Sequence, residues 1–252
     1  MAFVRVWSVL LLLLGASSPV AYAQTLASAI EDAPDGFVRM SYAVRDGVCG
    51  NGENMSFSHG RLTEHDWECE PGPARVTVEK RNGIILDIKT RVGGNWFSDV
   101  ADVTELGEVD SREAAQWLAS IVETGESRVA RRAIMPASIA RDSDAWRVFL
   151  RVAGDQNRPS RLRRAVFQQL GIEAGAVELE GAEDQRSVGD FDARTQAVFA
   201  LSQFPDDQSV PLLMDVARTH SDADLRRVAL FWLGQKQDAR VLDLFQEVLT
   251  RP

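Results

Sequence analysis

The side chains best suited to chemistry gather in one glycine-rich stretch of the N-terminal third. Cys49 and Cys69 are the chain's two cysteines, and they bracket His59 and His65, two of its three histidines. Two thiolates and two imidazoles could hold zinc, but the spacer between Cys49 and His59 matches no standard zinc arrangement. In an oxidising compartment, a pair of cysteines at this separation in the sequence predicts a disulfide instead, between Cys49 and Cys69.

A catalytic use of the same loops is the alternative. The candidate residues for an exported enzyme or metal-binding protein are His59, His65, Glu68 and Glu70. The sequence contains no G-x-S-x-G elbow, no phosphate-binding loop, no H-E-x-x-H and no C-x-x-C. Because no catalytic constellation is found, we predict no enzymatic activity, no metal and no cofactor.

The segment 1–23 has the features of a secretory signal peptide. Arg5 precedes the apolar run "VWSVLLLLLG", and the later "SSP" and "AYA" predict cleavage between Ala23 and Gln24. The apolar run is well below the ~20 residues needed to span a membrane, so an anchor is the less favoured interpretation. We therefore expect export to the periplasm or the extracellular space, with no membrane insertion after cleavage.

Charge limits the partners that the protein can have. Cleavage would change the net charge from −9 to −10, because it removes Arg5 and no acid. An acidic protein binds nucleic acid poorly, since neutralising phosphates needs clustered positive charge. The stretch "RPSRLRR" at 158–164 argues locally for nucleic acid, but export and net acidity weigh against it. We expect no nucleic-acid partner.

Residues 36–98 alternate with a period of two and predict a small antiparallel β domain, after an N-terminal segment at 24–35. In "FVRMSYAVR" the apolar and polar side chains take opposite faces of a strand. The stretch "ARVTVEKRNGIILDIKTRV" repeats this pattern on both sides of Asn82-Gly83, the dipeptide of a type I′ hairpin turn. Such a domain has a small core, and we expect the disulfide to link its long loops.

After Asp99 the apolar period changes to that of helices. Asp110 and Glu113 have the spacing of a capping box for a helix that ends at Gly125. Further helices are predicted at 127–140, 143–154, 159–171, 191–204, 207–218, 222–235 and 238–249. Most joins between them are short and polar, so neighbouring helices are expected to pack antiparallel. Residues 99–252 therefore form the predicted helical repeat domain.

Four arginines mark a repeat in this domain. They recur at a nearly constant interval, and each leads into an apolar helix that contains alanine: Arg131, Arg163, Arg194 and Arg226. Asp206 and Asp238 are separated by the same interval as Arg194 and Arg226, and each opens the second helix of its pair. A period of this size, with two helices per unit, predicts an α-solenoid in which the units stack.

The register resembles the HEAT-repeat family of the ARM-type fold, in its PBS-lyase HEAT-like form. The residues that carry the resemblance are "ARTQAVFALSQ" at 193–203 and "LRRVALFWLG" at 225–234, within a region from about 127 to 252. The resemblance implies a structural role for the repeat arginines, which would bond neighbouring turns and the carbonyl ends of helices. The unit that begins at Arg163 departs from the pattern in the acidic "GAVELEGAEDQRSVG", where we expect an irregular insertion at 175–190.

These patterns predict an α+β protein that is mainly α, with a short HEAT-like α-solenoid preceded by a small disulfide-linked antiparallel β domain. The terminal unit of a solenoid needs a polar outer face, and the helix at 238–249 is expected to be that cap. Trp96 and Phe97 follow the last strand, and we expect them to pack between the two domains. Phe231 and Trp232 are expected to lie in the core of the repeat.

Stacked repeats make extended surfaces suited to proteins or peptides, so we expect a non-enzymatic binding or scaffold protein of the cell envelope. In HEAT-like stacks the second helices line one long surface. By helical phase its outward residues are Gln208, Asp215, Arg240, Asp243 and Glu247. This mostly acidic ridge would favour a protein partner with a basic patch or segment.

Overall fold

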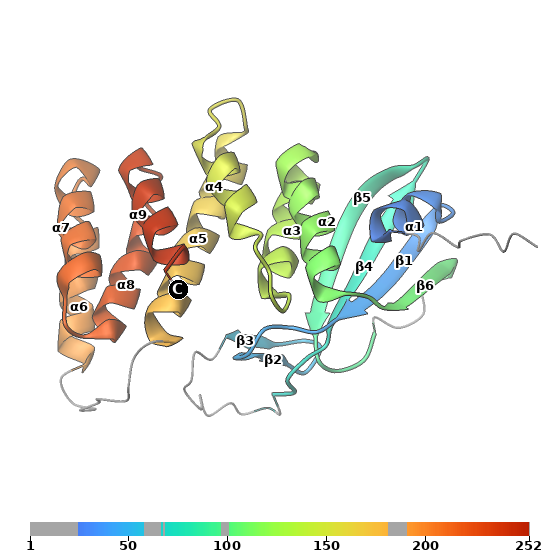
Figure 1. The fold of residues 1–252 in the computed structure, drawn as a ribbon, viewed down its shortest axis with the longest axis horizontal. Helices are drawn as coiled ribbons and strands as arrows, with labels where there is room; N and C mark the ends of the chain where they lie inside the picture. The colour runs from blue at the N-terminus through green and yellow to red at the C-terminus, as the bar shows by residue number, and fades with distance from the viewer. Residues whose placement is uncertain (1–24, 58–66, 68, 97–100, 181–190, 252) are drawn as a thin grey trace, which may run out of the picture.

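The computed structural model describes residues 25–57, 67, 69–96, 101–180 and 191–251, which form a sheet region and a helical array (Figure 1). The sheet region contains α1 (Leu26–Asp32), β1 (Gly36–Tyr42), β2 (Val48–Gly50), β3 (Met55–Phe57), β4 (Ala74–Arg81), β5 (Ile84–Val92) and β6 (Val103–Glu108). The array contains α2 (Ser111–Thr124), α3 (Ser127–Ile139), α4 (Trp146–Gly154), α5 (Ser160–Glu180), α6 (Phe191–Ser202), α7 (Asp206–Thr219), α8 (Ala223–Leu233) and α9 (Ala239–Leu249). Among these helices, none combines the length and the apolar character needed to cross a membrane.

The main sheet is mixed, which corrects the prediction of a purely antiparallel domain. Its strand order is β5-β4-β1-β6, in which β1 pairs antiparallel with β4 and parallel with β6. β6 lies at 103–108, beyond residue 98, where the predicted β domain ended. Gly107, with a φ of 72°, lies where the register between β1 and β6 shifts. Alternation assigns side chains to faces but does not fix the direction of a neighbouring strand, so the sequence pattern missed this pairing.

β4 and β5 form the predicted hairpin. Asn82 and Gly83 have φ values of 52° and 72°, and a type I′ turn requires positive φ at both positions. Asp35 accepts hydrogen bonds from the backbone N–H groups of Asn82 at 2.6 Å and Gly83 at 3.2 Å. These bonds hold the pKa of the Asp35 carboxyl below its usual value, because they stabilise the charged form. The prediction of a hairpin turn at this dipeptide is confirmed.

One face of the sheet packs against α1 and α3. Val38 and Tyr42 of β1 are fully buried there, and the Tyr42 hydroxyl donates a 2.7 Å hydrogen bond to the carbonyl O of Pro136 in α3. Burial raises the pKa of this hydroxyl. Lys80 of β4 is also buried, and its ammonium donates to carbonyl O atoms at the end of α1, including that of Ile30 at 2.9 Å. The sheet and the start of the array therefore share one core.

α2 begins where the sequence predicts, but the side chain of Glu113 in its first turn does not bond the N-cap residue as a capping box requires. Asp110 is the N-cap, and its carboxylate accepts the Glu113 N–H at 2.9 Å. In a capping box the Glu113 carboxylate would return to the N–H of Asp110. Here it accepts the N–H of Leu26, at the start of α1, at 2.6 Å. Glu113 therefore links two helices that are far apart in the sequence.

The helices of the array form two rows (Figure 1). α2, α4, α9 and α7 make one row, the α2 row, and α3, α5, α8 and α6 make the other, the α3 row. The α8–α9 hairpin lies between α4–α5 and α6–α7, so the last two units stack in the reverse of their chain order. The structure therefore differs from the solenoid that the repeat predicts, in which each unit packs on the one before it in the chain.

α5 packs closely against the end of α8 at two glycines, Gly171 of α5 and Gly234, the C-cap of α8. A Cβ at Gly171 would lie 2.8 Å from the carbonyl O of Leu230 and 3.0 Å from the Cα of Gly234. Nearby, the side-chain amide of Gln168 donates a 2.8 Å hydrogen bond to the side-chain O of Gln235. Because neither glycine has a side chain, α8 can lie directly against α5, in the place that α6 would take in a chain-order stack.

α5 is one continuous helix, which shortens the predicted irregular insertion. The insertion was expected at 175–190, but residues 175–180 continue α5 as far as Glu180. Residues 181–190 lie outside the described residues. Alanine, leucine and glutamate are good helix formers and outweigh the cost of the single Gly175, about 1 kcal/mol.

α9 is an interior helix, so the prediction that the helix at 238–249 caps the array is wrong. Its apolar side chains Val241, Leu244, Phe245 and Val248 are fully buried, and α9 packs against α4, α5 and α7. The outermost described unit is α6–α7 (Figure 1). α9 is interior because the last two hairpins stack in reverse order, and no sequence pattern within α9 could reveal that order.

Candidate interaction surface

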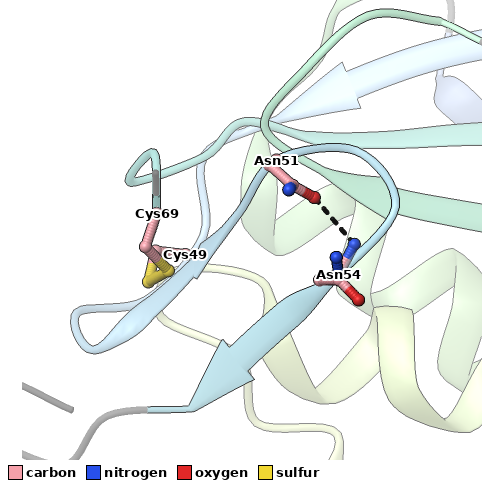
Figure 2. Close-up of a disulfide and its surroundings, with 4 residues drawn as sticks. All are labelled: Cys49, Asn51, Asn54 and Cys69. Atoms are coloured by element: carbon pink, nitrogen blue, oxygen red, sulfur yellow. Dashed lines mark hydrogen bonds between the residues drawn. A yellow bond between two sulfur atoms is a disulfide. The ribbon is translucent and has the colours of Figure 1, made fainter. Parts of the chain in front are cut away.

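The two cysteines form the predicted disulfide beside the β2–β3 hairpin (Figure 2). Cys49 and Cys69 are bonded through their Sγ atoms, and their Cα atoms are 5.2 Å apart. The side-chain O of Asn51 accepts the N–H groups of Glu53 at 3.0 Å and Asn54 at 2.8 Å, which fixes the turn between β2 and β3. A cysteine in a disulfide has no thiolate to offer, so the structure contradicts the zinc arrangement that used both cysteines.

Only one of the other loop candidates lies in the part of the chain that the structure describes. His59, His65 and Glu68 fall outside it. The carboxylate of Glu70 accepts the N–H of Gly94 at 3.0 Å, and its backbone forms a β-bridge with Gly50. Glu70 therefore joins the disulfide loop to the end of β5. Within the described residues, no three His, Cys, Asp or Glu side chains are grouped to hold a metal ion.

The five residues of the predicted partner surface are all exposed. They are Gln208 and Asp215 on α7, and Arg240, Asp243 and Glu247 on α9. The structure brings the two sets together, because α7 and α9 are neighbours in the α2 row. We call this surface the α7–α9 ridge.

Ion pairs balance much of the charge on the α7–α9 ridge, so it is less acidic than the sequence suggests. Arg218 and Arg251 lie 3.4 Å and 3.2 Å from the Glu247 carboxylate. Arg240 pairs with Asp238 at 2.7 Å, and this hydrogen bond lowers the pKa of Asp238. Helical phase within α9 could not show that Arg218 of α7 reaches this surface.

A shallow, open depression lies on the same ridge. Its volume is about 280 Å³, and Asp243, Gln246, Glu247 and Thr250 line it. Small-molecule sites are mostly apolar, and they bury most of the ligand. A polar hollow on the outside of one helix instead suits a contact with a protein surface.

Among the repeat arginines, Arg226 bonds the end of a neighbouring helix. Its guanidinium donates to the carbonyl O of His220, just beyond α7, at 2.7 Å. Arg131 stays with its own helix, where it donates to a backbone carbonyl one turn earlier at 3.3 Å. Arg163 is half-buried, and the side chain of Arg194 lies outside the described residues. The four arginines therefore do not share one contact.

An aromatic patch lies where the sequence predicted only core. It consists of Phe199 of α6 with Phe231 and Trp232 of α8, and the Trp232 ring centroid is 5.1 Å from each phenylalanine ring. Phe199 is 44% exposed and Phe231 is 39% exposed, while Trp232 is half-buried. α8 turns Leu230 and Leu233 inward, so Phe231 must point to solvent. The prediction that Phe231 lies in the core is wrong.

Exposed apolar side chains concentrate on the last two hairpins of the array. Among the described residues, the large exposed apolar side chains are Phe199, Phe204, Leu212, Phe231 and, away from the array at the β4–β5 turn, Ile84. Single exposed apolar residues are ordinary, whereas a group of them marks an interaction site. The sequence held one signal of this: the apolar residues of α6 are spread around the helix among polar ones, so a single buried face cannot hold all of them.

Trp96 lies on the face of the sheet that is opposite the helices, and not between the two parts of the chain as predicted. The guanidinium carbons of Arg39 and Arg75 are 5.3 Å and 5.9 Å from its ring centroid. Arg39 alternates with the buried side chains of β1, so it must face away from the core. Phe97 lies outside the described residues.

Comparison with known proteins confirms the resemblance seen in the sequence. The family model of the PBS lyase HEAT-like repeat matches residues 193–219, which include most of α6 and all of α7. No curated protein and no solved structure matches the chain. The C-terminal region therefore contains a HEAT-like repeat, and α6–α7 is its helical pair.

Proposed function

We propose that this protein is a non-enzymatic interaction module that binds another polypeptide through its helical array. The presence of a HEAT-like repeat supports this role, because such repeats stack into extended surfaces for protein partners. The aromatic patch of Phe199, Phe231 and Trp232 carries the proposal. Packed aromatic side chains that remain partly exposed offer large apolar contacts to an apolar side chain of a partner.

The proposed place of action is the periplasm or the extracellular space, with a scaffold role in the cell envelope. The charged, apolar and small-residue stretches within 1–23 support export. The Cys49–Cys69 disulfide supports an oxidising compartment, where such bonds persist. Mass spectrometry of the secreted chain would test the cleavage site, and a chain that still carries Ala23 would refute it.

The α7–α9 ridge is a second surface that the same function could use. Asp215 and Asp243 are exposed, and no basic side chain of the described residues pairs with either. These two carboxylates would favour a partner with a basic patch. The aromatic patch is the stronger candidate, because desolvated aromatic contacts contribute more to binding than exposed charges do.

The test captures partners from a native envelope extract with matched variants of the whole mature chain. We expect Phe199→Ala with Phe231→Ala to reduce recovery of the specific partner at least about tenfold, as loss of central aromatic contacts does. Ile84→Ala removes a large exposed apolar side chain from the far end of the molecule, and recovery should not change. Circular dichroism should show that all the variants are folded.

The outcomes separate the surfaces. Equal recovery by wild type and the double alanine variant would refute the aromatic patch. Loss of the partner only with Asp215→Arg, Asp243→Arg and Glu247→Arg combined would move the site to the α7–α9 ridge. If no protein is recovered above an unrelated exported control, the interaction function itself is wrong.

A further inference from the structure

Two pairs of arginines lie on exposed sides of α3 and α5, in the same row of helices as the aromatic patch on α8 and α6. Arg128 and Arg131 lie on α3, Arg161 and Arg164 lie on α5, and all four are exposed. The members of each pair are three positions apart, so they share one side of their helix. The number of residues between the first pair and the second is close to the repeat period. The two pairs therefore lie at similar positions in α3 and α5, which are neighbours in the row.

The packing of α3 and α5 brings the two pairs to the same level. The helices are neighbours and run in the same direction (Figure 1). A 2.9 Å hydrogen bond from the Gln169 amide to Ser138 Oγ aligns them, so that Arg131 lies level with Leu162. Axes of packed helices are ~8–10 Å apart, so the four exposed arginines concentrate positive charge at this level of the α3 row. We call this cluster the arginine face.

No ion pair among the described residues balances the charge of the arginine face. Among the described residues, no carboxylate lies within ion-pair distance of its four arginines. Other arginines of the α3 row do have acidic partners: Arg132 of α3 pairs with Asp87 at 3.7 Å, and Arg227 of α8 pairs with Asp224 at 3.6 Å. In a chain with a net charge of −9, four neighbouring exposed arginines with no acidic partner in the described part of the chain are a strong local exception.

We propose that the arginine face and the aromatic patch together bind one acidic polypeptide segment of a partner protein. This inference rests on the proposed function and adds the chemistry of the partner. Arginine binds carboxylates through two parallel N–H donors, which suits aspartate and glutamate side chains. The same segment places an apolar side chain against Phe199 and Phe231.

The reversed order of the hairpins makes this combined surface possible. α8 carries Phe231 and lies directly beside α5, which carries Arg161 and Arg164. From α3 to α8 is two helix spacings, and the contacts of Gly171 with Leu230 and Gly234 place Phe231 level with the middle of α5, about two to three turns beyond Arg161 and Arg164. The whole path is therefore roughly 25 Å, which an extended chain covers with about eight residues. A short acidic segment with one apolar residue is therefore long enough to contact both parts.

The binding test uses a short fluorescein-labelled peptide in which glutamates flank a phenylalanine, titrated with the mature protein and followed by fluorescence anisotropy. We expect Arg161→Glu with Arg164→Glu to weaken the Kd about tenfold or more, because two attractions become repulsions. Arg112→Glu with Arg147→Glu makes the same change of net charge on the α2 row, and binding should be unchanged. Binding should also weaken as salt rises.

Control ligands make the proposal refutable. Peptides with lysine in place of glutamate, or alanine in place of phenylalanine, should bind more weakly. Equal binding of the lysine peptide, no binding of the acidic peptide, or equal loss in the two arginine variants would overturn the proposal. Equally tight binding of single-stranded DNA would show general polyanion binding and would also overturn it.

The two proposals fail in different ways. If Phe199→Ala with Phe231→Ala abolishes capture of the native partner but the acidic peptide shows no preference, the interaction function stands and the acidic partner is wrong. If wild type captures the partner and the Arg161→Glu, Arg164→Glu variant does not, both the interaction function and the acidic partner are supported. If neither variant affects capture, the α3 row is not the binding surface.

Discussion

Glu173 of α5 is a buried acid at the contact between the helical array and the loop after β1. The amide N of Gln169 lies 3.5 Å from its carboxylate and bonds Ser138 Oγ at 2.9 Å. Burial raises the pKa of Glu173 to about 7, although attraction to Arg45 and the contact with Gln169 act in the opposite direction. This carboxyl therefore changes its charge near neutral pH inside the folded protein.

The raised pKa predicts that the protein becomes less stable as the pH rises from 4.5 to about 7. Over this range the unfolded chain has released the proton that the folded chain still holds, so raising the pH favours unfolding. The loss is complete above the folded pKa and is at most roughly 3 kcal/mol. Glu173→Gln cannot ionise, so it should be more stable than wild type in mildly alkaline urea unfolding and should lack this slope.

Glu123 of α2 supplies the control for Glu173. A hydrogen bond from Arg151, at 2.8 Å, lowers the pKa of Glu123. Its contribution to stability is therefore present at neutral pH and lost in acid, and Glu123→Gln should leave the slope near neutrality intact. Identical slopes in wild type and Glu173→Gln would contradict the assignment to Glu173.

At the scale of elements, the close packing of α5 against the end of α8 depends on the missing side chains of its two glycines. From the α8 side, a Cβ at Gly234 would lie 2.9 Å from the carbonyl O of Phe167 and 3.2 Å from the Cα of Gly171. The atoms in the way belong to the backbone, which cannot move aside as the end of a flexible side chain can. An added methyl group on either helix would therefore push the two helices apart.

Gly171→Ala should destabilise the protein by about 1–3 kcal/mol in urea unfolding, as overpacking of a core does. Gly154→Ala is the matched control, because its Cβ would meet only Leu242 Cδ1, at an ordinary 3.7 Å. That variant should be neutral or slightly stabilised, since alanine favours a helix more than glycine does. Equal stability of the two variants would show that α8 does not approach α5 closely at Gly171.

At the scale of the whole molecule, the reversed stacking of the last two hairpins is compatible with the chain that links them. Residues 181–190 connect α5 to α6. An extended chain of this length reaches at most ~35 Å, more than the roughly 20 Å across two helix spacings. The sheet covers the other end of the array, so the molecule has one end formed by a sheet and one formed by α6–α7 (Figure 1).

Crosslinking should report the order of the units directly. Gln168→Cys with Gln235→Cys places thiols on α5 and α8, whose side chains touch at these positions, and a short bismaleimide should join them. Gln168→Cys with Ala200→Cys places thiols on α5 and α6, which follow one another in the chain, and should crosslink poorly. The described cysteines are both in the disulfide, so they do not compete. Preferential crosslinking of the second pair would establish chain-order stacking.

The sequence by itself determined the local features of this protein. Asn82-Gly83 requires a turn with positive φ, and Asp110 and Asp238 cap their helices with their own carboxylates. The helical periodicity and the HEAT-like register of the last units could also be predicted. Each of these features depends on residues within a few positions of one another or on a regular repeat, so reading along the chain is sufficient. Helical phase likewise placed the residues of the α7–α9 ridge on exposed sides.

Only the tertiary structure decided which surfaces meet. The parallel partner of β1, the bond from Leu26 to Glu113 and the place of α8 beside α5 all join segments distant in the sequence. Several apolar helices of the array have similar patterns, so periodicity does not specify their neighbours. The order of packing in turn decided that Phe231 is exposed and that Arg218 of α7 pairs with Glu247 on the α7–α9 ridge. Neighbours are selected by the fit of whole faces, such as two glycines that allow close approach, and this fit exists only in three dimensions.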